Sequence, residues 1–463
     1  MPRAPRWANS MRIGTGRLAA VLAFVVVVVG SIVSSLGVSQ GIRPDTITPA
    51  TIDFDETVYY PALAFANGEN PYDPGYVSRY AVDNPFPPYA PITLLIHQPL
   101  TLVPLEVAAL VYAALTVVLT VVLAYAAFRC NDVSVTATRV LLVAALILLS
   151  RPGRQNVLNG QTTLEVVLGV YVALYFSQRS ALVSGLGLAV SMLKPTVGIP
   201  LTILMLARRD ARAVVAGVLI TAAANLPLLA ILAERAGGLS TFLRQITTTL
   251  AGFQLNPEYN PASSSLRVDL VASASRFLGE PLAGTAQFAL ALVVLGVAAY
   301  AVTAAERLER GRTRSLSATV ICLAILLCGY HQAYDLLLLT LPLVALAEDR
   351  LPAGLFTPRQ RWVLLLLFAG LAANYASSFG VLERLGIYEP SARAGPSARL
   401  AWLLLVTLNG AALVVLFVSY TVATLQLVRR IASSATAAGE PRPAPADASA
   451  PLDRLRLDHL APT

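Results

Sequence analysis

Apolar residues along this chain gather into long runs, which short basic stretches and two long polar segments separate. The clearest runs cover residues 18–38, 105–128, 214–233 and 400–428. A run of about 20 apolar residues is long enough to cross the hydrocarbon core of a bilayer as a helix. The pattern therefore predicts an all-α polytopic membrane protein.

Several other apolar runs are too short to cross a bilayer alone. Runs 164–176, 181–193 and 196–207 predict two or three broken helices that meet at membrane depth, where protein or a wet cavity must surround their ends. Run 89–102, which prolines interrupt, predicts an interfacial or re-entrant piece. Further spans are expected at 139–150, 288–304, 316–327, 336–346 and 362–379. The total is about 11–13 transmembrane helices.

The polar segments divide the chain into one membrane domain and a tail. We expect the membrane domain at 1–430, with a first outer loop at 39–91 and a second at 234–281. Residues 431–463 are rich in Ala, Pro and Ser without apolar periodicity, which is typical of a disordered tail.

Composition and charge agree with a membrane protein. Of the 463 residues, 56% are hydrophobic and 13% are charged, whereas soluble domains carry roughly 25% charged residues. The net charge of +8 does not indicate nucleic-acid binding, because arginines concentrate in short loops at 207–213, 306–314, 348–361 and 427–430. Such loops stay cytoplasmic. They predict cytoplasmic N- and C-termini, extracytoplasmic polar segments and a plasma-membrane location.

Acidic and aromatic residues open the first polar segment. Asp53, Asp55 and Glu56 precede Tyr59 and Tyr60 at near-helical spacing. A carboxylate at the membrane surface is costly unless it is used or paired. The segment is either part of a catalytic site or a solvated acidic loop with tyrosine anchors.

Amide groups and one lysine mark two further positions on the same predicted side. Asn159 and Gln161 either bind sugar hydroxyls or cap the following helix. Lys194 is the only lysine in the chain and lies between two apolar runs. It is either a ligand for an anion such as a lipid phosphate or a snorkelling interfacial residue.

Two later stretches add polar side chains. NPASSSLR carries Asn260 and Arg267, and an arginine can hold a phosphate through two hydrogen bonds. GYHQAYD carries His331 and Asp335 between two apolar runs. His331 is a phosphate ligand, a proton carrier or a structural hydrogen bonder, the last being most common for a lone histidine. The three histidines and three cysteines have no metal-ligand spacing, so we expect no metal.

In their order along one side of the membrane, these motifs resemble those of glycosyltransferase family 87, in the GT-C class. The matching motifs, between Asp53 and Asp335, are VYYPALAF, NPYDP, FPPYAP, NGQ, LKP, NPASSSLR and the late histidine loop. The resemblance implies a GT-C-type fold with long extracytoplasmic loops. It also implies transfer of a hexose, mannose in this family, from a polyprenyl-phosphate sugar to a glycolipid or glycan. The lipid-linked donor is a substrate, and no separate cofactor is expected.

The resemblance also implies roles for particular residues. The family's acid lies four residues before the tyrosine pair, which selects Asp55 as general base, with Asp53 as the alternative. Phosphate is a good leaving group, so one carboxylate suffices for transfer with inversion, whereas inverting hydrolysis of an ordinary glycoside needs two. Lys194 with Arg267 or His331 would hold the phosphate. The expected substrate contacts are Tyr59, Tyr60, Asn159, Gln161, Asn260 and Asp335.

Two other functions fit the same pattern of spans. One is a transporter or flippase of lipid-linked sugars, although the internal repeat expected of many transporters is missing from the sequence. The other is a GT-C transferase that uses a different lipid-linked sugar, such as arabinose.

Overall fold

Helices account for nearly all regular structure in this protein. The computed structural model describes residues 16–31, 52–256, 259–309, 314–375 and 396–437. Within those residues, extended backbone pairs only at a single antiparallel bridge between Arg267 and Gln332. The predicted all-α fold is confirmed.

Long apolar helices form the outer part of the bundle. Four described helices are long and apolar enough to cross a membrane. They are α6 (Leu105–Cys130), α12 (Ala211–Arg235), α15 (Gly284–Leu308) and α20 (Pro396–Ala437). Large apolar side chains such as Leu219 and Leu226 are exposed on α12, as expected for a surface that contacts lipid. The chain is therefore a polytopic membrane protein.

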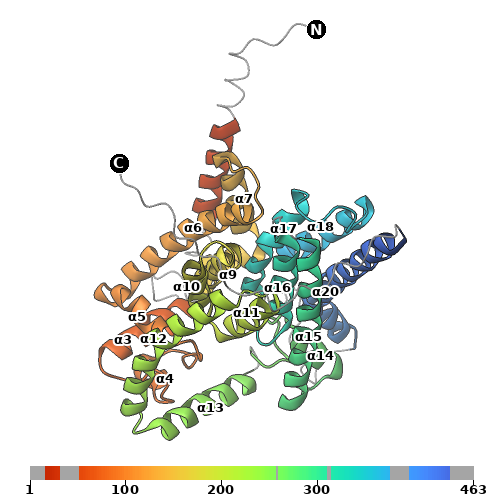
Figure 1. Ribbon diagram of the computed structural model, residues 1–463. Helices are drawn as coiled ribbons and strands as arrows, with labels where there is room; N and C mark the ends of the chain where they lie inside the picture. The colour runs from red at the N-terminus through yellow and green to blue at the C-terminus, as the bar shows by residue number, and fades with distance from the viewer. Residues whose placement is uncertain (1–15, 32–51, 257–258, 310–313, 376–395, 438–463) are drawn as a thin grey trace, which may run out of the picture.

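Shorter apolar helices fill the centre. Figure 1 shows α9, α10, α11, α16 and α17 between α12 on one side and α20 on the other. The shorter helices are Gly16–Ser31, α7 (Ala137–Leu149), α9 (Thr163–Phe176), α10 (Ala181–Ser191), α11 (Pro195–Ala207), α16 (Ser315–Leu327), the 3-10 helix η3 (Ala333–Leu339), α17 (Thr340–Ala347) and α18 (Pro358–Ala373). The three broken runs predicted between 164 and 207 are thus three separate helices.

The two polar segments fold into short helices that pack on each other. Asn70 of the first segment donates to Gln245 of the second at 2.9 Å, and Arg235 donates to the carbonyls of Phe65 and Glu69. Figure 1 shows α3, α4 and α13 together at one end of the bundle. The helices are α2 (Ile52–Phe54), a π-helix η1 (Asp55–Tyr59), α3 (Tyr60–Ala66), α4 (Tyr76–Tyr80), α5 (Ile92–His97), the 3-10 helix η2 (Gln98–Leu102), α13 (Leu239–Leu255) and α14 (Leu270–Leu278).

Two segments are more helical than the sequence pattern predicts. Residues 151–163, a polar stretch between two apolar runs, contain α8 (Arg151–Asn159). The Ser150 side chain accepts the N–H of Gly153 and caps this helix, and Pro152 occupies its first turn. Helix α20 continues to Ala437, past the predicted start of the disordered tail at residue 431, and residues 438–463 lie outside the described ranges.

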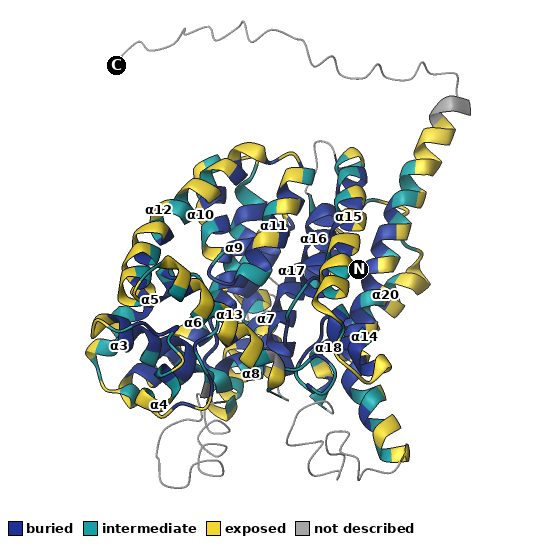
Figure 2. Ribbon diagram, turned by 90° about the horizontal axis from the view of Figure 1, so that it is seen from below, coloured by how far each residue is buried: buried dark blue, intermediate teal, exposed yellow. Residues whose placement is uncertain are grey.

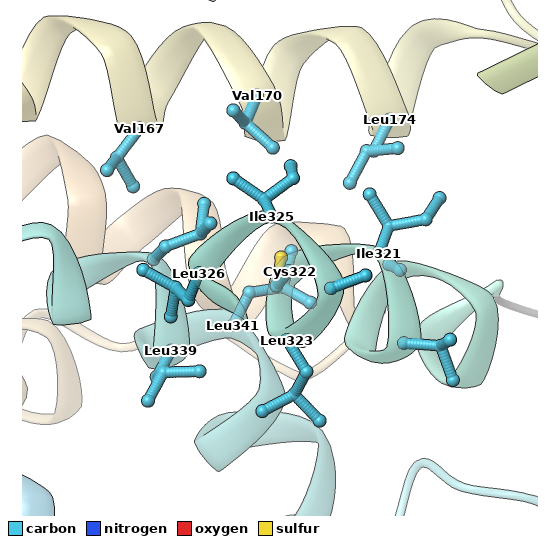
Figure 3. Close-up of a cluster of buried hydrophobic side chains, with 14 of the residues drawn as sticks. Val167, Val170, Leu174, Ile321, Cys322, Leu323, Ile325, Leu326, Leu339 and Leu341 are labelled. Carbon is cyan, nitrogen blue, oxygen red and sulfur yellow. The ribbon is translucent and has the colours of Figure 1, made fainter. Parts of the chain in front are cut away.

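The core lies where the short central helices meet. Figure 2 shows buried residues concentrated on α9, α16 and α17 and exposed residues along the outer faces of α6 and α12. In Figure 3, Val167, Val170 and Leu174 of α9 face Ile321 and Ile325 of α16. These side chains are buried. Every described residue of α16 is buried, so α16 is surrounded by protein rather than lipid.

Candidate active site

A cavity of about 380 Å³ lies where the first polar segment meets the ends of the short helices. Its volume is within the usual range for small-ligand sites, roughly 300–1,000 Å³. Its lining includes the polar side chains of Asp53, Gln161, Lys194, Arg267 and Gln332 together with prolines, Leu250, Phe253 and Val271. The predicted motifs that are far apart in sequence therefore meet at one place.

Two side-chain amides hold the carboxylate of Asp53 at this cavity. Its Oδ2 atom accepts hydrogen bonds from Asn159 Nδ2 at 2.8 Å and from Gln161 Nε2 at 2.5 Å. Its Oδ1 atom has no hydrogen-bond partner among the described residues. One oxygen is thus fixed and the other remains available to a substrate.

The turn between α8 and α9 brings these two amides to Asp53. Gly160 ends α8 in the left-handed conformation, with φ of 67°. A Cβ atom at Gly160 would lie 2.6 Å from the Cβ of Phe54, the residue next to Asp53. The predicted cap of the following helix is wrong, because Thr162 is the N-cap of α9 and makes no side-chain cap hydrogen bond. The amides of Asn159 and Gln161 bind the carboxylate of Asp53 instead.

The protonation of Asp53 reflects competing effects. Burial raises the pKa of the Asp53 carboxyl above its usual value, while the amides of Gln161 and Asn159 and the Lys194 ammonium lower it. A carboxylate with a raised pKa is a stronger base than an ordinary aspartate.

Asp55 and Glu56 have different surroundings from Asp53. Asp55 is half-buried in η1, does not line the cavity, and interacts with another group. Glu56 lines the cavity, and its carboxylate accepts the backbone N–H groups of Asp83 and Asn84 and the side-chain amide of Asn84. Burial raises the pKa of Glu56 to about 7, against these hydrogen bonds. Glu56 therefore anchors the proline-rich stretch that follows Asn84.

The tyrosine pair packs instead of lining the cavity. The hydroxyl of Tyr59 donates to the carbonyl of Val103 at 2.9 Å, and its ring meets Tyr60 edge-on. The ring of Tyr60 also packs on Tyr80. Neither tyrosine is among the residues around the cavity, so a substrate contact would require movement of this aromatic cluster.

Lys194 lies at the cavity wall but is already paired. Its Nζ atom is 2.7 Å from both carboxylate oxygens of Asp335 and 4.9 Å from the centre of the Tyr334 ring. Lys194 is only 4% exposed, so the ion pair offsets the cost of burying its charge. A snorkelling position is excluded by this burial.

Arg267 is held in the same manner. Its Nε and Nη2 atoms donate to the two oxygens of Asp269 at 2.9 Å, and its guanidinium lies 5.0 Å from the centre of the Tyr330 ring. Arg267 also lines the cavity. Two cations, each fixed between a carboxylate and a tyrosine ring, therefore face the same space as Asp53.

His331 links these two ion pairs without lining the cavity. Its Nδ1 atom is 3.0 Å from Asp335 Oδ2, and its backbone N–H donates to Asp269 Oδ2 at 3.3 Å. Its Nε2 atom is buried without a hydrogen-bond partner among the described residues. His331 is therefore placed to orient the carboxylates that hold Lys194 and Arg267.

Two other predicted contacts have local roles. Asn260 accepts the N–H of Ala262 at 2.9 Å and shapes a turn beside the cavity, while its neighbour Tyr259 lines it. Asp335 is the partner of Lys194 and lies behind it, 3.3 Å from Thr163 Oγ1.

Sequence reasoning missed the aromatic part of the wall. Tyr89, Tyr330 and Tyr334 line the cavity together with Gln332. Tyr89 belongs to the FPPYAP motif, and the next residue, Ala90, donates its N–H to the carbonyl of Leu193. The apolar run 89–102 predicts an interfacial or re-entrant piece, and only tertiary contacts reveal that its first residue, Tyr89, lines the cavity.

Within the described residues, no cluster of three His, Cys, Asp or Glu side chains could hold a metal ion. The expectation of a metal-free site stays a prediction.

The fold and the cavity together define a polytopic membrane protein with a polar binding site at the ends of its short helices. The family model of glycosyltransferase family 87 matches residues 86–328, more than half of the chain. The chain therefore belongs to glycosyltransferase family 87 and is a membrane glycosyltransferase. No curated protein and no solved structure matches it. The matched stretch includes Lys194 and Arg267, whereas Asp53 precedes it and His331 follows it.

Proposed function

We propose that this protein transfers a hexose, mannose by the family resemblance, from a polyprenyl-phosphate sugar to a glycolipid or glycan acceptor, with inversion. The observation that carries the proposal is that Asp53, Lys194 and Arg267 line one cavity. A base for an acceptor hydroxyl and cations for a departing phosphate are the two groups that this reaction needs.

Asp53 is the better candidate for the general base. Asp53 lines the cavity, is oriented by two amides and keeps Oδ1 available, whereas Asp55 lies outside the cavity lining. The acceptor proton moves to Asp53 Oδ1 as the acceptor oxygen bonds to the anomeric carbon of the sugar. The bond from that carbon to the phosphate oxygen breaks, and its electron pair stays on the lipid phosphate.

Lys194 and Arg267 stabilise the charge that grows on this phosphate. Asp335 and Asp269 already hold these two cationic side chains in place. Binding of the phosphate therefore does not have to order them. Fixed charges of this kind act without reorganisation during the reaction. The apolar wall at Leu250 and Phe253 suits the lipid part of the donor.

The arginine-rich loops support a plasma-membrane location with both termini in the cytoplasm. The polar segments and the cavity then face the extracytoplasmic side, where a lipid-linked sugar replaces a nucleotide sugar as donor.

The test is a transfer assay with radiolabelled polyprenyl-phosphate mannose and membranes that contain the full-length protein. Asp53→Asn keeps the shape of the side chain and one acceptor oxygen for Asn159 and Gln161, but removes the base. We expect transfer to fall by about 10²–10⁴-fold. Asp55→Asn, the matched control two residues away, should keep most activity.

The outcomes separate the parts of the proposal. Loss in Asp55→Asn with normal transfer in Asp53→Asn would reassign the base to Asp55. Absence of transfer from this donor by wild type, with a set of glycolipid acceptors present, would reject the donor class. Inversion is checked by comparing the anomeric configuration of donor and product by NMR.

A further inference from the structure

A second and larger cavity, of about 910 Å³, lies at the other end of the bundle. Helices α11 and α15 reach from one cavity to the other. For example, Gln287 near the start of α15 lines the candidate active site, whereas Glu306 and Glu309 at its end line the second cavity. Gln287 and Glu306 are 19 residues apart in α15, so about 28 Å of helix separates the two sites.

A buried charge network lies beside this cavity. Arg208, which is 1% exposed, donates through Nε to Asp210 Oδ2 at 2.7 Å. The other oxygen of Asp210 accepts from Arg314 Nη1 at 2.9 Å and from Gln178 Nε2 at 2.6 Å. The network joins the basic loops 207–213 and 306–314 to Gln178, so this part of the cavity is preorganised.

Each acidic side chain around the cavity has at least one partner, although Oε1 of Glu306 is buried without a hydrogen-bond partner among the described residues. Glu306 pairs with Arg314 at 2.6 Å. Glu309 accepts the N–H groups of Leu316 and Ser317 at the start of α16. Asp349 pairs with Arg361 at 2.6 Å, and Asp132 also interacts with another group.

Several arginine donors at the cavity are not bound by an acidic side chain. Arg179 donates to the carbonyl of Tyr175 and lies over its ring at 3.9 Å, without an ion pair among the described residues. The side chain of Arg350 makes no ion pair in the described structure. The buried Nη1 atom of Arg208 likewise lacks a hydrogen-bond partner there. Buried donors are nearly always satisfied, so this donor is a candidate contact for an anion.

We propose that this cavity binds a phosphate-bearing anion through Arg179, Arg350 and Arg208. Guanidinium groups match the geometry of phosphate oxygens and bind them by paired hydrogen bonds. The volume exceeds that of a single phosphate and admits a diphosphate or a phospholipid headgroup. Both sources share the same chemistry. The site is separate from the candidate active site, and its proposal stands whether or not Asp53 is the base.

The competing explanation is that these arginines serve only to fix membrane orientation. Arg212 and Arg359 offer a matched control, because they are exposed at the starts of α12 and α18, next to the same loops, and do not line the cavity. Removal of either pair changes the net charge equally.

The experiment compares wild type, Arg179→Ala/Arg350→Ala and Arg212→Ala/Arg359→Ala as full-length protein. Calorimetric titration of detergent-purified protein with inorganic pyrophosphate tests a soluble ligand. Native mass spectrometry after reconstitution in phosphatidylcholine vesicles, with or without phosphatidylglycerol, tests a lipid headgroup. We expect the cavity double variant to bind at least one probe about tenfold or more weakly than wild type. The control variant should bind as wild type.

Each result decides the proposal. A loss for pyrophosphate alone assigns a soluble phosphate compound, and a loss for phosphatidylglycerol alone assigns a headgroup. Equal losses in both double variants would show a general basic surface and overturn the proposal. Wild type that binds neither probe would also overturn it.

Discussion

Asp53 and Glu56 are three residues apart and line the same cavity, but their carboxylates have different partners. Asp53 accepts two side-chain amides through one oxygen, whereas both oxygens of Glu56 accept groups from Asp83 and Asn84. Asp53 therefore keeps an acceptor for substrate, and Glu56 does not. The sequence places both acids in the first polar segment, but their partners lie 27 to 108 positions away.

The raised pKa of Glu56 gives a pH-dependent stability. Its pKa is about 7 in the folded protein and about 4.5 ordinarily. Between these values the folded chain binds a proton that the unfolded chain releases, so stability falls as the pH rises through this window. The difference between the two pKa values corresponds to a loss of about 3 kcal/mol in the free energy of unfolding above pH 7. We expect Glu56→Gln to flatten the decline in the thermal unfolding midpoint of detergent-purified protein between pH 5 and pH 8.

Glu280→Gln is the control for that measurement, because Glu280 is exposed and does not line the cavity. It should leave the pH dependence as in wild type. An unchanged slope in Glu56→Gln would mean that Glu56 does not titrate in this range.

The Lys194–Asp335 pair requires a paired substitution to separate structure from function. Lys194→Met alone leaves a buried carboxylate unpaired, which costs about 3–5 kcal/mol. We expect Lys194→Met/Asp335→Asn to regain most of that stability, because it removes both charges. Transfer should stay low in the double variant, since the phosphate has lost a cation. Recovery of both stability and transfer would assign Lys194 a structural role only.

At the level of elements, the candidate site forms where short helices end. Apolar runs too short for a bilayer predicted these breaks, and NGQ and LKP mark two of them, at α8–α9 and α10–α11. The apolar pattern does not predict helix α8, because this polar helix depends on the cap at Ser150. The partner of Lys194 could not be predicted, since Asp335 is 141 positions away.

Close packing of α9 against α10 depends on glycines that face each other. A Cβ atom at Gly187 would lie 2.5 Å from the backbone nitrogen of Ala173 and 2.7 Å from the carbonyl oxygen of Gly169. Small residues allow such close approach between helices in membranes. We expect Gly187→Val to destabilise the protein by about 1–3 kcal/mol or more, because the two backbones must separate.

The matched control is Gly296→Val in α15, where a Cβ atom meets nothing within 4 Å. Thermal unfolding of both purified variants measures the difference. A midpoint for Gly187→Val equal to that of Gly296→Val would show that α9 and α10 do not need this contact.

At the scale of the whole molecule, the basic loops and the polar segments lie at opposite ends of the same helices. The sequence predicts this division from the positions of arginine alone, and the two cavities follow it. In the proposed orientation, the candidate active site faces outside and the arginine-lined cavity faces inside. The two cavities therefore face different aqueous compartments, and the distribution of arginine assigns a compartment to each.

Helix α12 and the following α13 allow that orientation to be tested. Ala211 is exposed at the start of α12, and Thr247 is exposed on α13, which packs on the first polar segment. Each is replaced by cysteine in a chain without Cys130, Cys322 and Cys328. We expect a membrane-impermeant maleimide to label Thr247→Cys in intact cells and Ala211→Cys only after permeabilisation. The reverse labelling would place Asp53 on the cytoplasmic side, where nucleotide sugars are available, and would remove the reason for a lipid-linked donor.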